Sequence, residues 1–143
     1  MPISLCDQLE QMVRSLSTLQ QSVQQSEEQL TRHHSESLRN STETVGLDRK
    51  AIELVWQQST DLFPHFLEIL EKLESADIAP QTEQQIRPYQ TEAHRRLRLI
   101  KVEAMRLRTA RQPMTVRKSY EQLTNHVAAL QQFAEAIARE ICA

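Results

Sequence analysis

The chain contains a single glycine, Gly46, among its 143 residues. Tight turns, phosphate-binding loops and left-handed helix caps usually require glycine, because glycine adopts positive backbone φ angles without steric cost. A sheet built from hairpins needs several such turns, so the sequence disfavours β structure. The commonest residues are Gln, Leu, Glu, Arg and Ala, which are good helix formers. The chain is therefore predicted to be all-α.

Apolar residues recur at alternating steps of four and three in four segments, which is typical of amphipathic helices. The segments predict helices at about 3–40, 48–75, 82–111 and 115–141, within one domain. Gly46 is predicted to break the chain between the first two helices. Short connections favour an elongated up-down-up-down bundle of about four long helices. The alternative is a three-helix arrangement that a second subunit completes.

The apolar stripes predict the core of this bundle. The first stripe holds Leu5, Leu9, Met12, Leu16, Leu19, Val23 and Leu30. The second holds Ala51, Val55, Gln58, Leu62, Phe66, Ile69 and Leu73. The third holds Ile86, Ala93, Leu97, Ile100, Ala104 and Leu107. The fourth, which is the most regular, holds Val116, Tyr120, Leu123, Val127, Leu130, Ala134, Ile137 and Ile141.

Two places leave alternatives open. Residues 31–45 hold only Leu38 and Val45 as large apolar residues, so the first helix either continues as a solvated extension to about residue 40 or frays into a loop. The second stripe keeps its phase through Pro64, which predicts one kinked helix. The alternative there is a short break, after which Asp61 caps a new helix.

The two cysteines, Cys6 and Cys142, are too few for a disulfide framework or a zinc site. In an up-down-up-down bundle the two chain ends meet, so the cysteines are expected within about 15 Å of each other. The N-terminal residues do not resemble a signal peptide, and no apolar run is long enough to cross a bilayer. We therefore expect a cytoplasmic protein with no membrane insertion and with both thiols reduced.

Charge is strongly segregated along the chain, although the formal net charge is only -2. Residues 1–92 carry seven basic and fifteen acidic side chains, whereas residues 93–118 carry nine basic and one acidic. The stretch 93–111 alone, AHRRLRLIKVEAMRLRTAR, has six Arg and one Lys. The modest total charge therefore conceals a dipolar protein with a basic third helix.

On a helical wheel, the basic helix places arginines opposite its core stripe, mixed with apolar residues. Arg and Met are enriched at protein interfaces, whereas Lys is depleted. We interpret this face as a protein-docking surface formed by Arg95, Arg98, Val102, Met105, Arg106 and Arg111. The alternative is that the arginines neutralise the acidic helices of their own bundle, or pair with Glu92 and Glu103 on the same helix.

Other functional classes find less support in the sequence. Phosphate binding would suit the positive charge, but six aromatic residues offer few platforms for base stacking, and no nucleic-acid-binding motif is present. The five histidines form no metal-binding pair. No nucleophile elbow or glycine-rich phosphate loop occurs either. We therefore expect no enzyme activity, no metal and no cofactor.

The segment YQTEAHRRLRLIKVEAMRLRTARQ, residues 89–112, resembles the signature segment of the PatD family of cyanobacterial heterocyst frequency control proteins. That pattern runs Thr-Glu, a Leu-Arg-Leu-Leu core, an acidic residue, and Ala-Arg-Gln. The matching positions are Thr91, Glu92, Leu97, Arg98, Leu99, Glu103, Leu107, Ala110, Arg111 and Gln112. The sequence departs from the pattern at Ile100, where the family has Leu, and at Glu103, where it has Asp.

The resemblance implies a small helical regulator of cell division and heterocyst patterning rather than an enzyme. Members of this family bind the tubulin-like division GTPase FtsZ and alter the assembly of its filaments. FtsZ or another acidic protein is therefore the expected partner. The choice of the basic helix as the docking site is our inference from the residues. The rival interpretations are a helical nucleic-acid binder and a structural oligomer, such as a homodimer, whose basic strip is neutralised between subunits.

Overall fold

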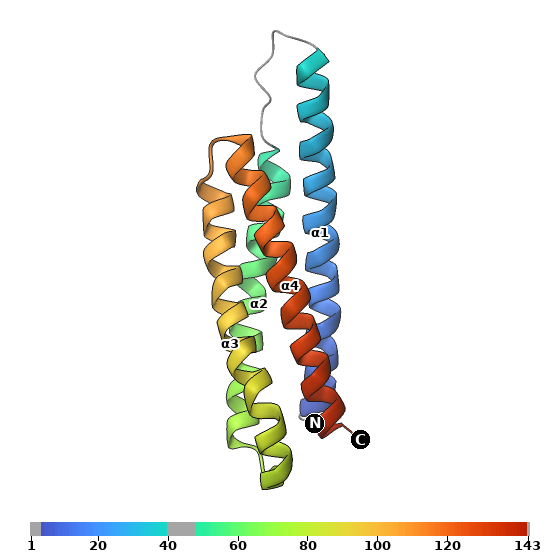
Figure 1. Cartoon of the computed structure of the whole chain (residues 1–143), viewed down its shortest axis with the longest axis vertical. Coiled ribbons are helices and arrows are strands. Elements are labelled where there is room, and N and C mark those ends of the chain that lie inside the picture. The colour runs from blue at the N-terminus through green and yellow to red at the C-terminus, as the bar shows by residue number, and fades with distance from the viewer. Residues whose placement is uncertain (1–3, 40–47, 143) are drawn as a thin grey trace.

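The computed structural model describes residues 4–39 and 48–142, without the side chains of 31–39. Four helices form an elongated up-down-up-down bundle, and no strand occurs in the described residues (Figure 1). Their bounds are α1 Leu5–Arg39, α2 Arg49–Ser75, α3 Pro80–Thr109 and α4 Pro113–Ile141. The prediction of an all-α bundle of four long helices is confirmed.

The helix ends lie within two residues of the predicted ends wherever those residues are described. α1 remains helical to Arg39, so the helical alternative holds for that part of 31–45. α2 is continuous through Pro64, which excludes the predicted alternative of a break there. Gly46, the expected limits at 3 and 40, and the rest of 31–45 lie outside the described residues.

Local sequence explains where three of the helices begin. Pro80 and Pro113 are the first residues of α3 and α4. A proline suits this position because its φ angle is already helical and its missing N–H would have had no partner inside the helix. At the start of α2, the Asp48 carboxylate accepts a hydrogen bond of 3.2 Å from the Ala51 backbone N–H.

Each helix packs against two neighbours around the bundle. The contact between α3 and α4 is the most extensive, and the contact between α1 and α2 is the least extensive. Both chain ends lie at one end of the bundle, whereas the connection from α3 to α4 lies at the other (Figure 1). The basic C-terminal part of α3 is therefore remote from the chain ends.

The core follows the predicted stripes with one correction in α2. All the predicted core residues of α3 and α4 are buried except Ile141, which is partly buried. In α2, Ala51 and Gln58 are only partly buried, and Ile52 and Ser59 occupy the core in their place. Ser59 can be buried because its hydroxyl donates to the Val55 carbonyl at 2.8 Å, so it brings no unpaired polar group into the core.

Cys6 and Cys142 form a disulfide, with their Cα atoms 5.9 Å apart. The predicted proximity of the two residues is confirmed, but the expectation of two reduced thiols is wrong. Cys6 lies in the first turn of α1, and Cys142 directly follows the last residue of α4. Because these helix ends meet, the Cα separation falls within the range that a disulfide spans.

Candidate functional site

The outward side of α3 carries the residues that the sequence suggested for docking. The opposite side of α3 is buried, as Leu97, Ile100 and Leu107 show. Val102 and Met105 lie outside the core, with 45% and 50% of their surface exposed. α3 therefore presents exposed apolar side chains on the same segment that concentrates basic charge.

Some basic residues of α3 are directed at neighbouring helices. The guanidinium of Arg108 lies 3.8 Å from the ring centroid of Trp56, and its Nε atom is 3.6 Å from a carboxylate oxygen of Glu53. Lys101 places its Nζ atom 4.6 Å from the ring centroid of Phe63. All three of these partners belong to α2. Part of the basic charge thus fastens α3 to α2. The Arg108–Glu53 pair is of the kind that the alternative interpretation expected, whereas the cation–π contacts were not predicted.

Arg95 and Arg106 are exposed but are paired along α3 itself. An Arg95 Nη1 atom lies 3.4 Å from Glu92, and an Arg106 Nη1 atom lies 2.8 Å from Glu103. Both pairs have the three-residue spacing that brings helix side chains together. Arg95 and Arg106 therefore contribute donors to the surface, but little uncompensated charge.

Arg98 and Arg111 differ from the other arginines of this surface. Both are exposed, and the side chain of neither forms a hydrogen bond or ion pair with any residue in the described ranges. Arg98 lies one helical turn before Val102, on the same side of α3. Arg111 lies in the connection that follows α3. Arg98 therefore leaves positive charge uncompensated beside the exposed Val102, and Arg111 leaves a second such charge just beyond the end of α3.

A buried polar cluster lies behind this surface, between α3 and α4. The Glu103 residue is only 6% exposed, and its carboxylate accepts from Arg106. The His126 residue of α4 is 8% exposed, and its Nδ1 atom lies 3.0 Å from an Arg96 guanidinium nitrogen. Burial lowers the pKa of His126, and the positive charge of Arg96 lowers it further, whereas the carboxylate of Glu103 opposes the shift. A neutral imidazole that accepts from Arg96 fits these surroundings.

The C-terminal end of α3 is tied to the beginning of α2. Arg49 donates to the backbone carbonyls of Arg108 and Ala110, at 3.5 and 3.1 Å. The last carbonyl groups of a helix have no partner within the helix, so a guanidinium group there is favourable. Sequence reasoning missed this contact and the contact between Arg96 and His126. Each joins residues far apart in the sequence, although His126 could have been noticed beside Val127 in the fourth stripe.

The segment that resembles the PatD signature mixes core and surface positions. Leu97, Glu103, Leu107 and Ala110 are buried, and Leu99 and Glu92 are partly buried. Thr91 is exposed and donates its hydroxyl to the Arg87 carbonyl, and Gln112 precedes the first residue of α4. Much of the pattern therefore describes how α3 packs, and its two exposed arginines, Arg98 and Arg111, are the ones without a side-chain partner in the described ranges.

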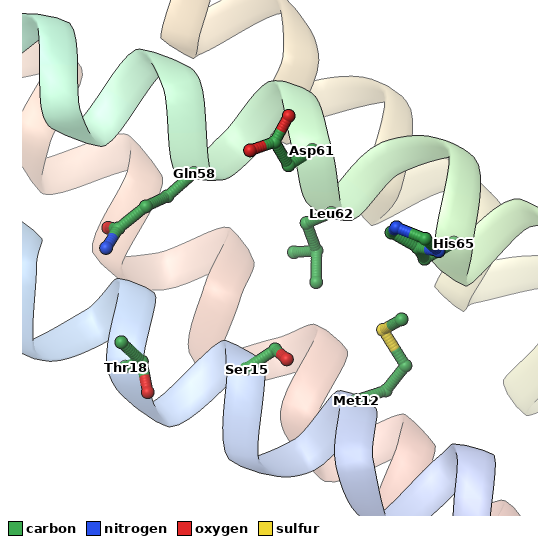
Figure 2. Close-up of a pocket in the computed structure, with 7 residues that line it drawn as sticks. All are labelled: Met12, Ser15, Thr18, Gln58, Asp61, Leu62 and His65. Carbon is green, nitrogen blue, oxygen red and sulfur yellow. The ribbon is translucent and has the colours of Figure 1, made fainter.

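A groove of about 260 Å³ lies between α1 and α2 (Figure 2). Its lining includes Ser15, Asp61 and His65, the residue types of a hydrolase triad. No hydrogen bond joins these three residues in the structure, and Figure 2 shows that Asp61 and His65 do not converge on Ser15. A triad requires the base to contact both the nucleophile and the carboxylate, so this groove lacks that arrangement.

Among the side chains that the structure describes, at residues 4–30 and 48–142, no group of three or more His, Cys, Asp or Glu could hold a metal ion. None of the helices described there combines the length and apolar character that crossing a membrane requires. Comparison of the chain with protein-family models, with curated proteins and with solved structures gives no match.

Proposed function

We propose that this chain is a non-catalytic binding protein that docks on an acidic protein partner. The contact surface is the α3 docking face, defined by Arg95, Arg98, Val102, Met105, Arg106 and Arg111. The observation that carries the proposal is that Arg98 is exposed and has no side-chain partner in the described ranges, one helical turn before the exposed Val102; Arg111 adds a second such charge just beyond the end of α3. An apolar centre with arginines around it is typical of protein interfaces.

The basic residues of this region fall into two groups, those with partners inside the bundle and those without, and this supports the choice of surface. If the charge served only to neutralise the bundle, all the arginines would be expected to face acidic neighbours. Arg108 does so, and Arg96 packs against His126. Arg98 and Arg111 do not, and their charge remains available to a partner. Complementary charge also accelerates association and fixes the orientation of the complex.

FtsZ filaments are the partner that we propose first. The support is the resemblance of residues 89–112 to the signature segment of the PatD family, whose members bind FtsZ. In this proposal the chain acts in the cytoplasm, where it modulates filament assembly and thereby influences cell division and heterocyst differentiation. The bundle supplies a stiff rod, and the α3 docking face lies along one of its sides.

The direct test is co-sedimentation with purified FtsZ from the same organism, in the presence of GTP. We expect the chain to pellet with the filaments, to change the amount of polymer, and to bind less well as salt is raised. A parallel binding assay uses random-sequence duplex DNA. Steeply salt-dependent binding to DNA without pelleting on FtsZ would contradict the proposal and favour the nucleic-acid alternative. A tight dimer that binds neither would favour the structural alternative.

A further inference from the structure

We infer that the Cys6–Cys142 disulfide is a site of thiol–disulfide exchange in the folded protein, open to neutral thiol reductants and selective against anionic ones. This inference does not depend on the proposed docking function. It rests on the position of the disulfide, on the groove beside it, and on the charge of the groove.

The disulfide lines a groove of about 490 Å³ between α1 and α4. This volume lies within the range of roughly 300–1,000 Å³ that is usual for small-molecule sites. Cys6 and Cys142 are only partly buried, whereas Leu9 and Ile137, about one turn further into the bundle, are completely buried. The two sulfur atoms therefore lie outside the sealed core, and a small thiol can approach them without opening the bundle.

The exchange reaction needs two thiol molecules of the reductant. A thiolate attacks one cysteine sulfur and forms a mixed disulfide with it. The bond between the two protein sulfurs breaks, its electron pair passes to the other cysteine, and that thiolate takes a proton from water. A second reductant thiolate attacks the reductant sulfur of the mixed disulfide and forms the oxidised reductant. The cysteine sulfur leaves with the electron pair of the broken bond and takes a proton from water. The protein gains two electrons and two protons in all.

The rim of the groove is acidic. Besides the cysteines it is lined by Asp7, Glu10, Glu135 and Arg139. Glu10 is paired with Arg14 at 2.7 Å, whereas Asp7, Glu135 and Arg139 have no ion-pair partner among the residues that the structure describes, so two unpaired carboxylates outweigh one unpaired guanidinium. The C-terminal end of α4 adds partial negative charge at Cys142. The attacking thiolate of glutathione carries additional negative charge from its carboxylates, so it meets more repulsion on approach than the singly charged thiolate of 2-mercaptoethanol.

The product of the reaction is also well defined. Cys6 and Cys142 are the only cysteines in the sequence, so no third thiol can trap an alternative disulfide. Reduction opens a covalent ring that spans a sequence separation of 136 residues and releases the first turn of α1 from the end of α4. The expected structural response is faster amide exchange at those two helix ends, while the opposite end of the α3–α4 pair changes least.

The experiment compares 2-mercaptoethanol, a neutral monothiol, with glutathione on the oxidised full chain. Released thiols are alkylated and counted over time, in native buffer at low salt and again in urea. We expect the native rate to rise in proportion to thiol concentration while the helical circular dichroism persists. The ratio of the 2-mercaptoethanol rate to the glutathione rate should be several-fold larger in the folded than in the unfolded protein. High salt should reduce this difference.

A pair of variants tests the role of the rim. The double variant Asp7→Asn, Glu135→Gln should raise the native glutathione rate several-fold at low salt and raise the 2-mercaptoethanol rate by a smaller factor. The control Glu28→Gln, Glu71→Gln removes the same charge from exposed positions elsewhere and should change neither rate. Three results would overturn the inference: two free thiols in the untreated protein, a native rate that does not depend on thiol concentration, or equal rate ratios in folded and unfolded protein.

Discussion

Helices α3 and α4 share the most extensive contact in the bundle, whereas α1 lies between two grooves, one against α2 and one against α4. The α3–α4 contact includes a buried carboxylate, Glu103, and a buried imidazole, His126, and each has a partner. Buried side-chain atoms without a hydrogen-bond partner among the described residues occur in both regions, at Gln8 and Gln20 in α1 and at Arg96 and Thr124 in the α3–α4 pair. Both regions also have regular apolar stripes, so the difference between them lies in the extent of the α3–α4 contact and in the two grooves that flank α1.

This difference indicates that the α3–α4 pair and α1 have different structural roles. The α3–α4 pair is a stiff support that holds the α3 docking face in one shape. α1 completes the core with its apolar stripe but is flanked by a groove on each side, and the disulfide fastens its first turn to α4.

The largest expected effect is loss of the disulfide. The Cys6→Ser variant cannot form the disulfide, which joins residues 136 positions apart in the sequence. Loop-closure entropy predicts that the free energy of unfolding falls by about 5 kcal/mol. Urea denaturation of the variant against the oxidised protein measures the loss. If the comparison above is right, amide exchange accelerates most in the first turns of α1. A loss of unfolding free energy below about 1 kcal/mol, or equal acceleration of amide exchange in every helix, would contradict the comparison.

The second largest loss of stability is expected from truncation of core leucines. Leu123→Ala and Leu130→Ala in α4 should each cost about 2–5 kcal/mol, because both side chains are completely buried. Leu97→Ala in α3 should behave alike. Leu16→Ala in α1 should fall at the lower end of that range, because the groove beside Met12 gives the site more freedom to relax. Urea denaturation compares the four variants, and a larger loss at Leu16 than at Leu123 would reverse the proposed order.

The arginines of the docking face should differ in their effect on stability. Arg106→Ala leaves the buried Glu103 carboxylate without its ion-pair partner and should cost about 1–2 kcal/mol, moderated because Arg106 is itself exposed. Arg98→Ala should cost less than about 0.5 kcal/mol, since Arg98 has no partner in the described structure. Thermal unfolding distinguishes the two. Equal effects would show that the Glu103–Arg106 pair does not support the fold.

The smallest effect concerns pH. The pKa of His126 is lowered in the folded protein, first by burial and then by Arg96, so the folded state prefers the neutral imidazole. The stability that this preference contributes is fully present above the pKa of histidine in the unfolded chain, near 6.5, and declines as the pH falls below that value. The His126→Gln variant should therefore lose less stability than the wild type between pH 7.5 and pH 5.5. Parallel losses in urea titrations at both pH values would contradict this assignment.

Much of the fold could be predicted because helix periodicity is a local property. Four apolar stripes and the absence of turn-forming glycines were sufficient for the helices, their order and the meeting of the chain ends. The choice of Gln58 over Ser59 for the core was wrong because spacing alone does not tell which polar side chain can pair its hydrogen-bonding group inside a helix.

The candidate site could be predicted only in part. The helical wheel of the basic helix placed Arg98, Val102 and Met105 on the outside of α3, and all three are exposed in the structure. The alternative that arginines pair with Glu92 and Glu103 is confirmed for Arg95 and Arg106, but the sequence did not show that the Glu103 carboxylate is buried or that Arg98 has no partner in the described ranges. The Arg49 contact with the end of α3 and the disulfide depend on residues brought together by the tertiary fold, and no local pattern indicates them.

The most direct test of the docking face is co-sedimentation of the double variant Arg98→Glu, Arg111→Glu with FtsZ filaments. These positions are preferable to Arg95 and Arg106 because neither has an intramolecular partner in the described ranges, so the fold should be unaffected. The control Lys50→Glu, Lys118→Glu makes the same change in net charge at exposed positions outside the face. We expect at least a tenfold loss of binding for the first variant, an unchanged melting temperature, and wild-type binding for the control. Equal binding by both variants would contradict the central claim that α3 meets the partner.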